Sequence, residues 1–323
     1  MNEWIGQART RAQHEGAMGD HQIAGIMKYR PLACCALVLA GLLLWPIQVN
    51  AQAQVNDLLA RAWSALGASG DAWAAGSSSV RGRAVARGLT EQALALDRTS
   101  PEAHLRMGQV LYEEGSFDDA ALAFREAIRL RPDDARAYTS LGVALEGRGE
   151  YDGALMAHRK ALSLAPTRAE IFMNLGNVLA AKGSLDAAIA EYRHALDLDL
   201  NLYLVHTNLG VALYEKGDVD GAIASYRMAI RIRPDAAEAH TNLGNALKLK
   251  GDLESAVAAH RTAIRLEPDF AEAHANLGHT LKTSGRTTEA AHAFRTYLRL
   301  APNMPITRAK ITAIRLLLSE LER

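Results

Sequence analysis

A spacing of 34 residues runs through most of the chain and constrains its fold more than any other feature. Glycine recurs at this spacing in two columns, and columns of alanine and leucine keep the same register. The first glycine column consists of Gly108, Gly142, Gly176, Gly210, Gly244 and Gly278. A fixed period of this length indicates a tandem array of one supersecondary unit. The six units are 101–134, 135–168, 169–202, 203–236, 237–270 and 271–304.

Each unit is predicted to be a pair of antiparallel helices, A and B, and the fourth unit shows why. Apolar residues at helical spacing predict helix A over Leu204–Lys216. Gly217 suits the left-handed residue that ends such a helix, and Asp218 is placed to cap the next one. Helix B is expected over about Asp220–Arg233, and Pro234 ends it. One helix pair cannot bury its apolar side alone, so stacked pairs are expected to share their cores in an all-α solenoid.

Both flanks of the array are predicted to be helical. The register continues weakly upstream, so residues 52–100 are expected to form a degenerate N-terminal helix pair with an irregular Gly/Ser stretch at Gly67–Ser79. Downstream, Thr307–Leu321 carries an apolar stripe beside basic residues. The stripe consists of Ile311, Ile314, Leu318 and Leu321. Residues 305–323 are therefore expected to form a capping helix with one solvent-facing side.

The repeats resemble the tetratricopeptide repeat family. In the fourth unit the residues at the family positions are Leu209, Gly210, Leu213, Gly217, Ala222, Tyr226, Ala229 and Pro234. The resemblance implies a right-handed superhelical solenoid whose A helices line a concave groove. Local packing is expected to depart from the family where His158 and His260 replace a Phe or Tyr, where Tyr297 replaces an alanine and where Leu200 replaces the proline.

Asparagine recurs on the predicted A helices and marks the candidate binding site. The asparagine ladder consists of Asn174, Asn208, Asn242 and Asn276, supported by Asn177 and Asn245 one turn further. An asparagine amide both donates and accepts, so it can pair with a peptide backbone. Helix layers about 8–10 Å apart would provide one rung per roughly three residues of an extended peptide. Hydrogen bonding between repeats is the alternative role, and the two roles are compatible.

The sequence Asn-Leu-Gly-Asn at 174–177 and 242–245 is similar to the repeat domain of the O-linked N-acetylglucosamine transferases. That resemblance implies capture of a protein backbone by inward-facing asparagines. Residues 305–323 are too few for a transferase catalytic domain, so no activity is inferred. Lys248 and Lys282 lie one turn beyond the glycine of successive A helices and are candidate rim contacts for a ligand carboxylate, although a solvated role is favoured.

No cofactor, catalytic residue or metal site is predicted. His206, His240 and His274 keep the 34-residue spacing, but layers about 8–10 Å apart separate their rings too far to share a zinc ion with bonds near 2 Å. Tyr138 and Phe172 fill the same position in other repeats, so we interpret this column as packing. The sequence contains none of the common phosphate-binding or hydrolase motifs.

The N-terminal region is expected to carry a targeting signal. Leu32–Trp45 is an unbroken apolar run preceded by Lys28 and Arg30 and followed by a small residue at Ala51. This arrangement predicts a secretory signal peptide over 27–51, with residues 1–26 an over-extended start. An uncleaved membrane anchor is the alternative, in which case 32–45 is the expected membrane contact. Cys34 and Cys35, the two cysteines of the chain, lie inside the apolar run.

Composition narrows the function. Lys plus Arg and Asp plus Glu both number 36, and this zero net charge argues against nucleic acid as a partner. We therefore expect an exported, periplasmic, non-enzymatic protein that binds an extended peptide or partner subunit in its groove, as an adaptor in envelope assembly or secretion, with no small-molecule substrate. Membrane anchoring facing the periplasm is the alternative location. The alternative functions are a structural scaffold that uses its convex face and caps, and a substrate-recruiting module of a glycosyltransferase system.

Overall fold

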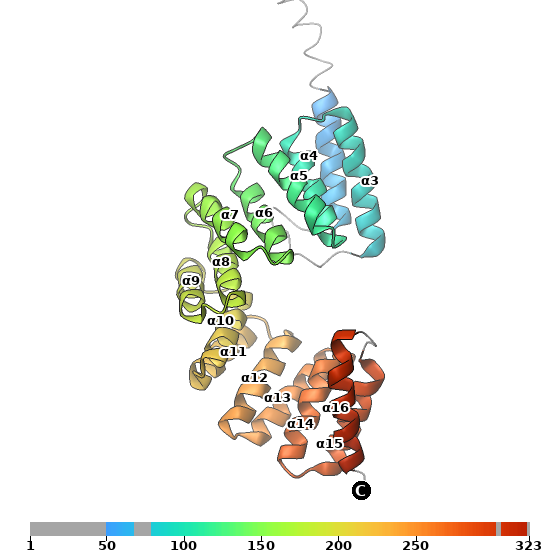
Figure 1. Cartoon of the computed structure of the whole chain (residues 1–323), viewed down its shortest axis with the longest axis vertical. Coiled ribbons are helices and arrows are strands. Elements are labelled where there is room, and N and C mark those ends of the chain that lie inside the picture. Colours follow the sequence, from blue (N-terminus) through green and yellow to red (C-terminus); the bar gives the residue numbers. More distant parts are fainter. Residues whose placement is uncertain (1–49, 68–78, 302–304, 322–323) are drawn as a thin grey trace, which may run out of the picture. The chain divides into compact units, whose positions relative to one another are not determined.

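The computed structural model describes residues 50–67, 79–301 and 305–321 (Figure 1). This part of the chain contains helices and no strand, which confirms the all-α prediction. A helix over 50–65 precedes the labelled ones. The next helices are α3 (Val80–Leu96), α4 (Pro101–Glu113), α5 (Phe117–Leu130), α6 (Ala135–Gly147), α7 (Tyr151–Leu164), α8 (Ala169–Ala181) and α9 (Leu185–Leu198). They are followed by α10 (Tyr203–Lys216), α11 (Val219–Ile232), α12 (Ala237–Lys250), α13 (Leu253–Leu266), α14 (Ala271–Thr283), α15 (Thr287–Leu300) and α16 (Pro305–Leu321).

The chain divides into two compact units, residues 1–110 and 111–323, with the boundary inside α4. In the first unit, the helix at 50–65 and α3 share a core with the part of α4 that ends at Val110. Trp63 and Leu66 pack there with Ala86 and Val110, and Val55 packs in a neighbouring cluster. The predicted signal segment at 32–45 and residues 1–26 lie outside the described residues.

The second unit is a stack of helix hairpins in chain order. Helices α6 to α15 pair as A and B within each hairpin, and each B helix also packs against the next A helix. Successive A helices approach one another directly, α6 to α8, α8 to α10, α10 to α12 and α12 to α14. The B helices make no equivalent approach within the described residues. The A helices therefore form the inner side of the stack, and we call the surface of α6, α8, α10, α12 and α14 the A face.

Each hairpin is held by an aromatic ring of helix B that lies flat on a glycine of helix A. A Cβ at Gly176 would lie 2.5 Å from the ring of Tyr192, and one at Gly278 would lie 2.5 Å from the ring of Phe294. His158 and His260 take the same place against Gly142 and Gly244, and both are fully buried. The glycine column thus records the closest approach of the two helices. A histidine ring fills the position of the expected Phe or Tyr without opening the core.

The helix ends follow the turn chemistry of the sequence. Helix α10 ends at Gly217, which is left-handed with φ 91°, and Asp218 caps α11 by accepting a hydrogen bond from the Gly221 amide at 2.9 Å. The helices of this hairpin begin one residue earlier than predicted. Leu200 does not disrupt the turn it occupies, because its carbonyl accepts a hydrogen bond from His206 Nε2 at 3.1 Å.

Helix α16 covers the last hairpin. Ile314 is 1% exposed and packs with Tyr297 of α15, while Ile311 and Leu321 flank it. Leu317, rather than the predicted Leu318, completes this cluster, because the buried stripe advances by three, three and four residues. Among the described helices, none combines the length and the hydropathy required to cross a membrane.

Candidate functional site

The predicted asparagine ladder lies on the A face. The 34-residue register places equivalent residues of neighbouring A helices side by side, because those helices approach one another in the same order. The ladder position is held by Ser140 on α6, Asn174 on α8, Asn208 on α10, Asn242 on α12 and Asn276 on α14. All six predicted asparagines are partly exposed, whereas Ser140 is buried. The two possible roles, peptide binding and bonding between repeats, are separated along the stack.

In α8 and α10 the amides of Asn177 and Asn208 bond to each other, whereas the side chain of Asn174 makes no hydrogen bond to another residue of the described chain. The side-chain oxygen of Asn177 accepts hydrogen bonds from Tyr192 Oη at 2.9 Å and from Asn208 Nδ2 at 2.9 Å. Tyr192 belongs to helix B of the same hairpin as Asn177, while Asn208 belongs to the next hairpin. This three-residue cluster links two hairpins and uses the amide groups that a ligand would need. We call it the closed part of the ladder.

Between α12 and α14 the amides line a pocket of about 480 Å³. Asn242 and Asn245 of α12 face Asn276 of α14 across it. None of these three side chains makes a hydrogen bond to another residue of the described chain. The pocket is completed by Glu238, Thr241, Glu267, Phe270 and Glu272. This is the open part of the ladder, where three amides remain available to a ligand.

The ring packed behind the amides explains the difference between the two parts. Asn245 and Asn276 stand in the same register as Asn177 and Asn208, yet they are not bonded to each other. The residue equivalent to Tyr192 is His260, which has no hydroxyl, and neither of its ring nitrogens has a hydrogen-bond partner. Because no phenol hydroxyl donates a hydrogen bond to it, the side-chain oxygen of Asn245 is not held in position to accept one from the next hairpin.

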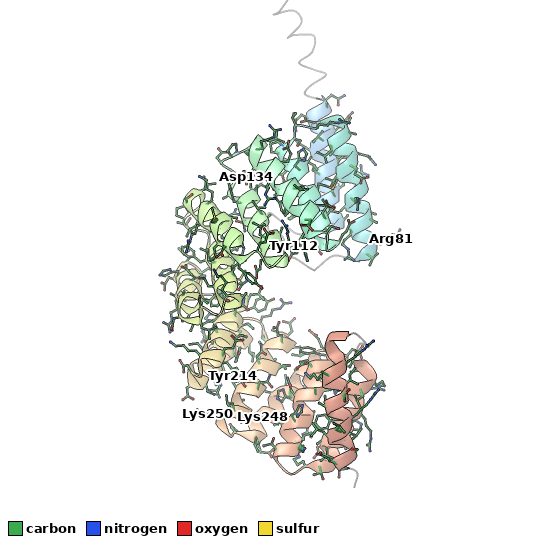
Figure 2. All side chains as sticks on the ribbon, in the orientation of Figure 1. Arg81, Tyr112, Asp134, Tyr214, Lys248 and Lys250 are labelled. Carbon is green, nitrogen blue, oxygen red and sulfur yellow. The ribbon has the colours of Figure 1, made fainter. Side chains whose placement is uncertain are left out.

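Positive charge gathers at the other end of the same helices. Lys248 of α12 and Lys282 of α14 hold equivalent positions, and Lys248 follows Tyr214 of α10 in the register (Figure 2). Lys282 lies 3.5 Å from Glu320 of α16. Burial and the charges of Lys248, Lys310 and Lys282 lower the pKa of His279, against the opposite effect of Glu272. His279 therefore stays neutral near pH 7, between the amide row and the lysines.

The 34-residue register continues into α16, where Lys310 holds the ladder position after Asn276. Its ammonium contacts both carboxylate oxygens of Glu272 at 2.6 Å. Lys310 therefore closes the open part of the ladder at its C-terminal end. This residue, together with Phe270 and Glu267, was not predicted as part of the site. The register contained the signal for Lys310, whereas the other two lie in a turn, which the helical pattern does not describe.

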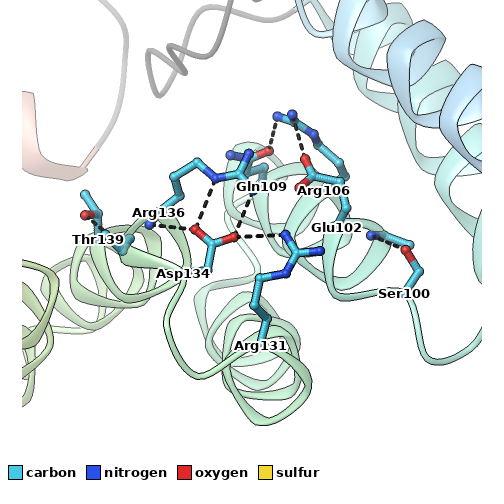
Figure 3. Close-up of polar contacts among 10 residues, drawn as sticks. Ser100, Glu102, Arg106, Gln109, Arg131, Asp134, Arg136 and Thr139 are labelled. Carbon is cyan, nitrogen blue, oxygen red and sulfur yellow. Dashed lines mark hydrogen bonds and ion pairs between the residues drawn. The ribbon is translucent and has the colours of Figure 1, made fainter. Parts of the chain in front are cut away.

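Ahead of the asparagines, the ladder position is used for structure. Arg106 of α4 lies 3.7 Å from the ring centre of Trp63, contacts Glu102 at 2.8 Å and donates to Gln109 at 3.1 Å (Figure 3). In the second unit, Asp134 caps α6 through the Arg136 amide and pairs with the guanidinium of Arg136 at 2.8 Å. The contacts of Arg106 thus hold its side chain within the first unit, and those of Asp134 hold the first turn of α6.

The histidine column contacts backbone rather than a shared ligand. Nε2 of His206, His240 and His274 lies 2.9 to 3.1 Å from the carbonyl oxygen six residues earlier. A carbonyl can only accept, so Nε2 carries the proton in each ring. The rings thus fasten the start of each A helix to the preceding turn. Within the described chain, no three His, Cys, Asp or Glu residues are grouped as metal ligands.

Comparisons with known proteins agree with this architecture. Family models described as "TPR repeat" match residues 176–217, 210–251 and 244–285. Models described as "Tetratricopeptide repeat" match 79–135, 105–169 and 271–304. Together they cover more than half of the chain. No curated protein sequence matches significantly.

Two solved structures share the fold at low sequence identity. The crystal structure of the APC/C hetero-tetramer Cut9-Hcn1 matches with a TM-score of 0.62 and 16% identity, covering 76% of this chain and 49% of that one. This chain therefore spans about half the length of that protein. PilF of Pseudomonas aeruginosa matches with a TM-score of 0.57 and 18% identity, covering 70% and 97%. The chain belongs to the tetratricopeptide repeat family of protein-interaction modules.

Proposed function

We propose that this protein binds an extended peptide segment of a partner along its A face, without catalysis, and that the open part of the ladder makes the main contacts. The observation that carries the proposal is the pocket between α12 and α14, where Asn242, Asn245 and Asn276 are partly exposed and unbonded within the described chain. Each amide can donate to a peptide carbonyl and accept from a peptide N–H. Recognition of this kind depends weakly on the ligand's side chains.

The test uses peptides selected from a random 12-residue library displayed on phage, with the full chain as bait. A triple variant, Asn242→Ala, Asn245→Ala and Asn276→Ala, is expected to lose at least tenfold in affinity for these peptides, because several hydrogen bonds are removed together. Asn201→Ala is the matched control, since Asn201 is exposed in the turn before α10 and does not line the pocket between α12 and α14. Unchanged binding by a triple variant with an unchanged melting temperature would refute the proposal.

The rival function is a scaffold that uses its outer face. Leu122 of α5 and Met156 of α7 are 61% and 72% exposed and stand 34 residues apart on successive B helices. If Leu122→Ser with Met156→Ser abolishes capture of the selected peptides while the triple asparagine variant retains it, the outer face is the binding surface. Loss in the asparagine variant alone assigns binding to the A face.

We further propose that the protein is exported and acts in the cell envelope as an adaptor, with the segment 27–51 as its signal peptide. The basis is the apolar run at Leu32–Trp45 with basic residues before it. Cell fractionation with N-terminal sequencing tests this, and a start near residue 52 in the periplasmic fraction is expected. Recovery of a peptide from residues 2–26, or of the chain in the cytosol beside a glycosyltransferase partner, would contradict it.

A further inference from the structure

The pocket between α12 and α14 has a chemistry of its own beyond the asparagine amides. Besides Asn242, Asn245 and Asn276, its lining includes three carboxylates and one aromatic ring. The carboxylates come from three different places: Glu238 in the first turn of α12, Glu267 after α13 and Glu272 in the first turn of α14. Phe270, half-buried in the turn before α14, provides an apolar surface beside them.

Two of the three carboxylates are uncompensated. Glu272 is neutralised by Lys310, which contacts both of its oxygens. Glu238 and Glu267 have no ion-pair partner within the described chain. The free lysine of α12, Lys248, stands ten residues beyond Glu238, about 15 Å along the helix axis. The pocket therefore keeps a net negative charge that the neighbouring lysines do not cancel.

The preceding junction of the stack lacks this combination. Between α10 and α12, the residues equivalent to Glu238, Glu267 and Phe270 are Leu204, Arg233 and Ala236. Arg233 brings a positive charge and is turned onto the ring of Tyr203, 4.7 Å from its centre. The repeat architecture alone thus does not produce the acidic, aromatic pocket. Between α8 and α10 the two acidic positions are kept as Glu170 and Asp199, but Leu202 replaces the aromatic ring, so among the described hairpins the acidic pair, the ring and the open amides come together between α12 and α14.

We propose that this pocket accepts a lysine or arginine side chain of the bound peptide, an inference that rests on peptide binding at the A face. The stem of such a side chain packs on Phe270, and its charged group reaches Glu238 and Glu267 while the three amides hold the adjacent backbone. An aromatic ring favours a cation over its face, and exposed carboxylates favour it electrostatically. Binding then selects segments with a basic residue at one position.

The experiment compares the peptides that different variants select from the random 12-residue library. The full chain is expected to enrich Lys or Arg at one position, and the variant Glu238→Gln with Glu267→Gln is expected to lose this enrichment. Both substitutions are isosteric and lie on exposed side chains, so folding is retained. Glu170→Gln is the control, because Glu170 holds the equivalent position on α8, beside the closed part of the ladder.

A second measurement uses one selected peptide and its Lys→Gln or Arg→Gln form. The substitution is expected to weaken binding to the full chain roughly fivefold and binding to the double glutamine variant hardly at all. Equal weakening in both proteins, or selection without basic enrichment, overturns the basic-residue pocket while leaving peptide binding intact. Loss of selection in the double variant as complete as in the triple asparagine variant also overturns it. Failure of the asparagine test refutes peptide binding itself.

Discussion

At the scale of single residues, the contact between a B-helix ring and an A-helix glycine sets the spacing of each hairpin. The five rings of this kind, His158, Tyr192, Tyr226, His260 and Phe294, lie so close to their glycines that a Cβ would come within 2.3 to 2.6 Å of a ring atom. The ring is packed in the core and cannot move away cheaply. The glycine is therefore required for close approach and not for backbone conformation.

Gly244→Ala is expected to destabilise the protein by about 1–3 kcal/mol, because the new methyl group would overlap the ring of His260. The matched control is Gly88→Ala in α3, where a Cβ would meet nothing within 4 Å. There the helix propensity of alanine is expected to stabilise by up to about 1 kcal/mol. Urea unfolding of the two variants measures both effects. Equal and small changes in both would show that the hairpin tolerates a wider spacing.

The buried histidines make stability depend on pH. Burial lowers the pKa of His158 and of His260 to about 4, from 6.5, and the charge of Lys248 adds to the effect at His260. Between pH 6.5 and pH 4, these two histidines therefore bind protons in the unfolded chain but not in the folded chain. The contribution of each ring to the free energy of unfolding is complete above pH 6.5. It is lost as the pH falls through this window, by roughly 3 kcal/mol per ring.

Replacing one ring isolates this contribution from that of the carboxylates. His260→Phe introduces the side chain that Phe294 provides in the equivalent position and removes two unpartnered nitrogens. The loss of stability between pH 7.5 and pH 4.5 is expected to be smaller in this variant than in the unmodified chain, as measured by urea unfolding. An identical pH dependence in both proteins would show that the ring becomes solvated.

At the scale of helices, the B-helix residue behind the ladder decides whether an asparagine is bonded inside the protein or open. Tyr192 holds the oxygen of Asn177, and Asn208 then bonds to the same atom. His260 provides no such donor to Asn245. Two hairpins with the same A-helix motif thus differ in the hydrogen bonding of their amides through a residue on the other helix.

An exchange of these side chains tests the idea. In the variant His260→Tyr, the new hydroxyl is expected to donate a hydrogen bond to the side-chain oxygen of Asn245, and Asn276 is expected to bond to the same atom. The affinity for the selected peptides should then fall severalfold, while the protein becomes more stable by about 1 kcal/mol. Tyr192→Phe is its mirror control, expected to release Asn177 and lower stability slightly without loss of peptide affinity. Unchanged peptide affinity in His260→Tyr would contradict the mechanism, provided that its stability rises.

Neighbouring hairpins are also linked by a row of ion pairs that the sequence did not reveal. The end of one A helix pairs with the start of the preceding B helix through Lys182 and Asp152, Lys216 and Asp186, and Lys250 and Asp220. Their carboxylates are 80% to 89% exposed, so each pair contributes little. The apolar cores of the hairpins therefore provide most of the stability of the stack, and these ion pairs help to align adjacent hairpins.

At the scale of the whole molecule, stability in a stack depends on nearest neighbours, so the last helix protects the site beside it. Ile314→Ala is expected to lower the free energy of unfolding by about 2–4 kcal/mol, because the side chain of Ile314 on α16 is 1% exposed and packs against α15. Loosening α16 also removes the packing that supports the hairpin of α14 and α15, which carries Asn276, so peptide affinity is expected to fall. Leu316→Ala, at a side chain 62% exposed on the same helix, is the control and should change neither.

The sequence predicted the fold almost completely and the site in part. Helices, turns and the stacking of hairpins follow from a period that places Gly210, Gly217 and Pro234 at fixed offsets. The same period pointed to the asparagines and to two possible roles, peptide binding and bonding between repeats, but it could not assign either role to a particular asparagine. Their division into closed and open parts depends on a contact between side chains of two helices, such as Tyr192 with Asn177. A repeat pattern describes positions and does not contain such contacts.

We expect a bound peptide to engage the amides of α12 and α14 and to leave Asn177 and Asn208 in their internal bonds. Side-chain amide NMR of the full chain labelled at asparagine Nδ2 tests it most directly, with one phage-selected peptide added to saturation. The signals of Asn242, Asn245 and Asn276 are expected to shift while those of Asn177 and Asn208 stay in place. Saturation with no shift at the first three, or with shifts confined to the other two, would contradict it.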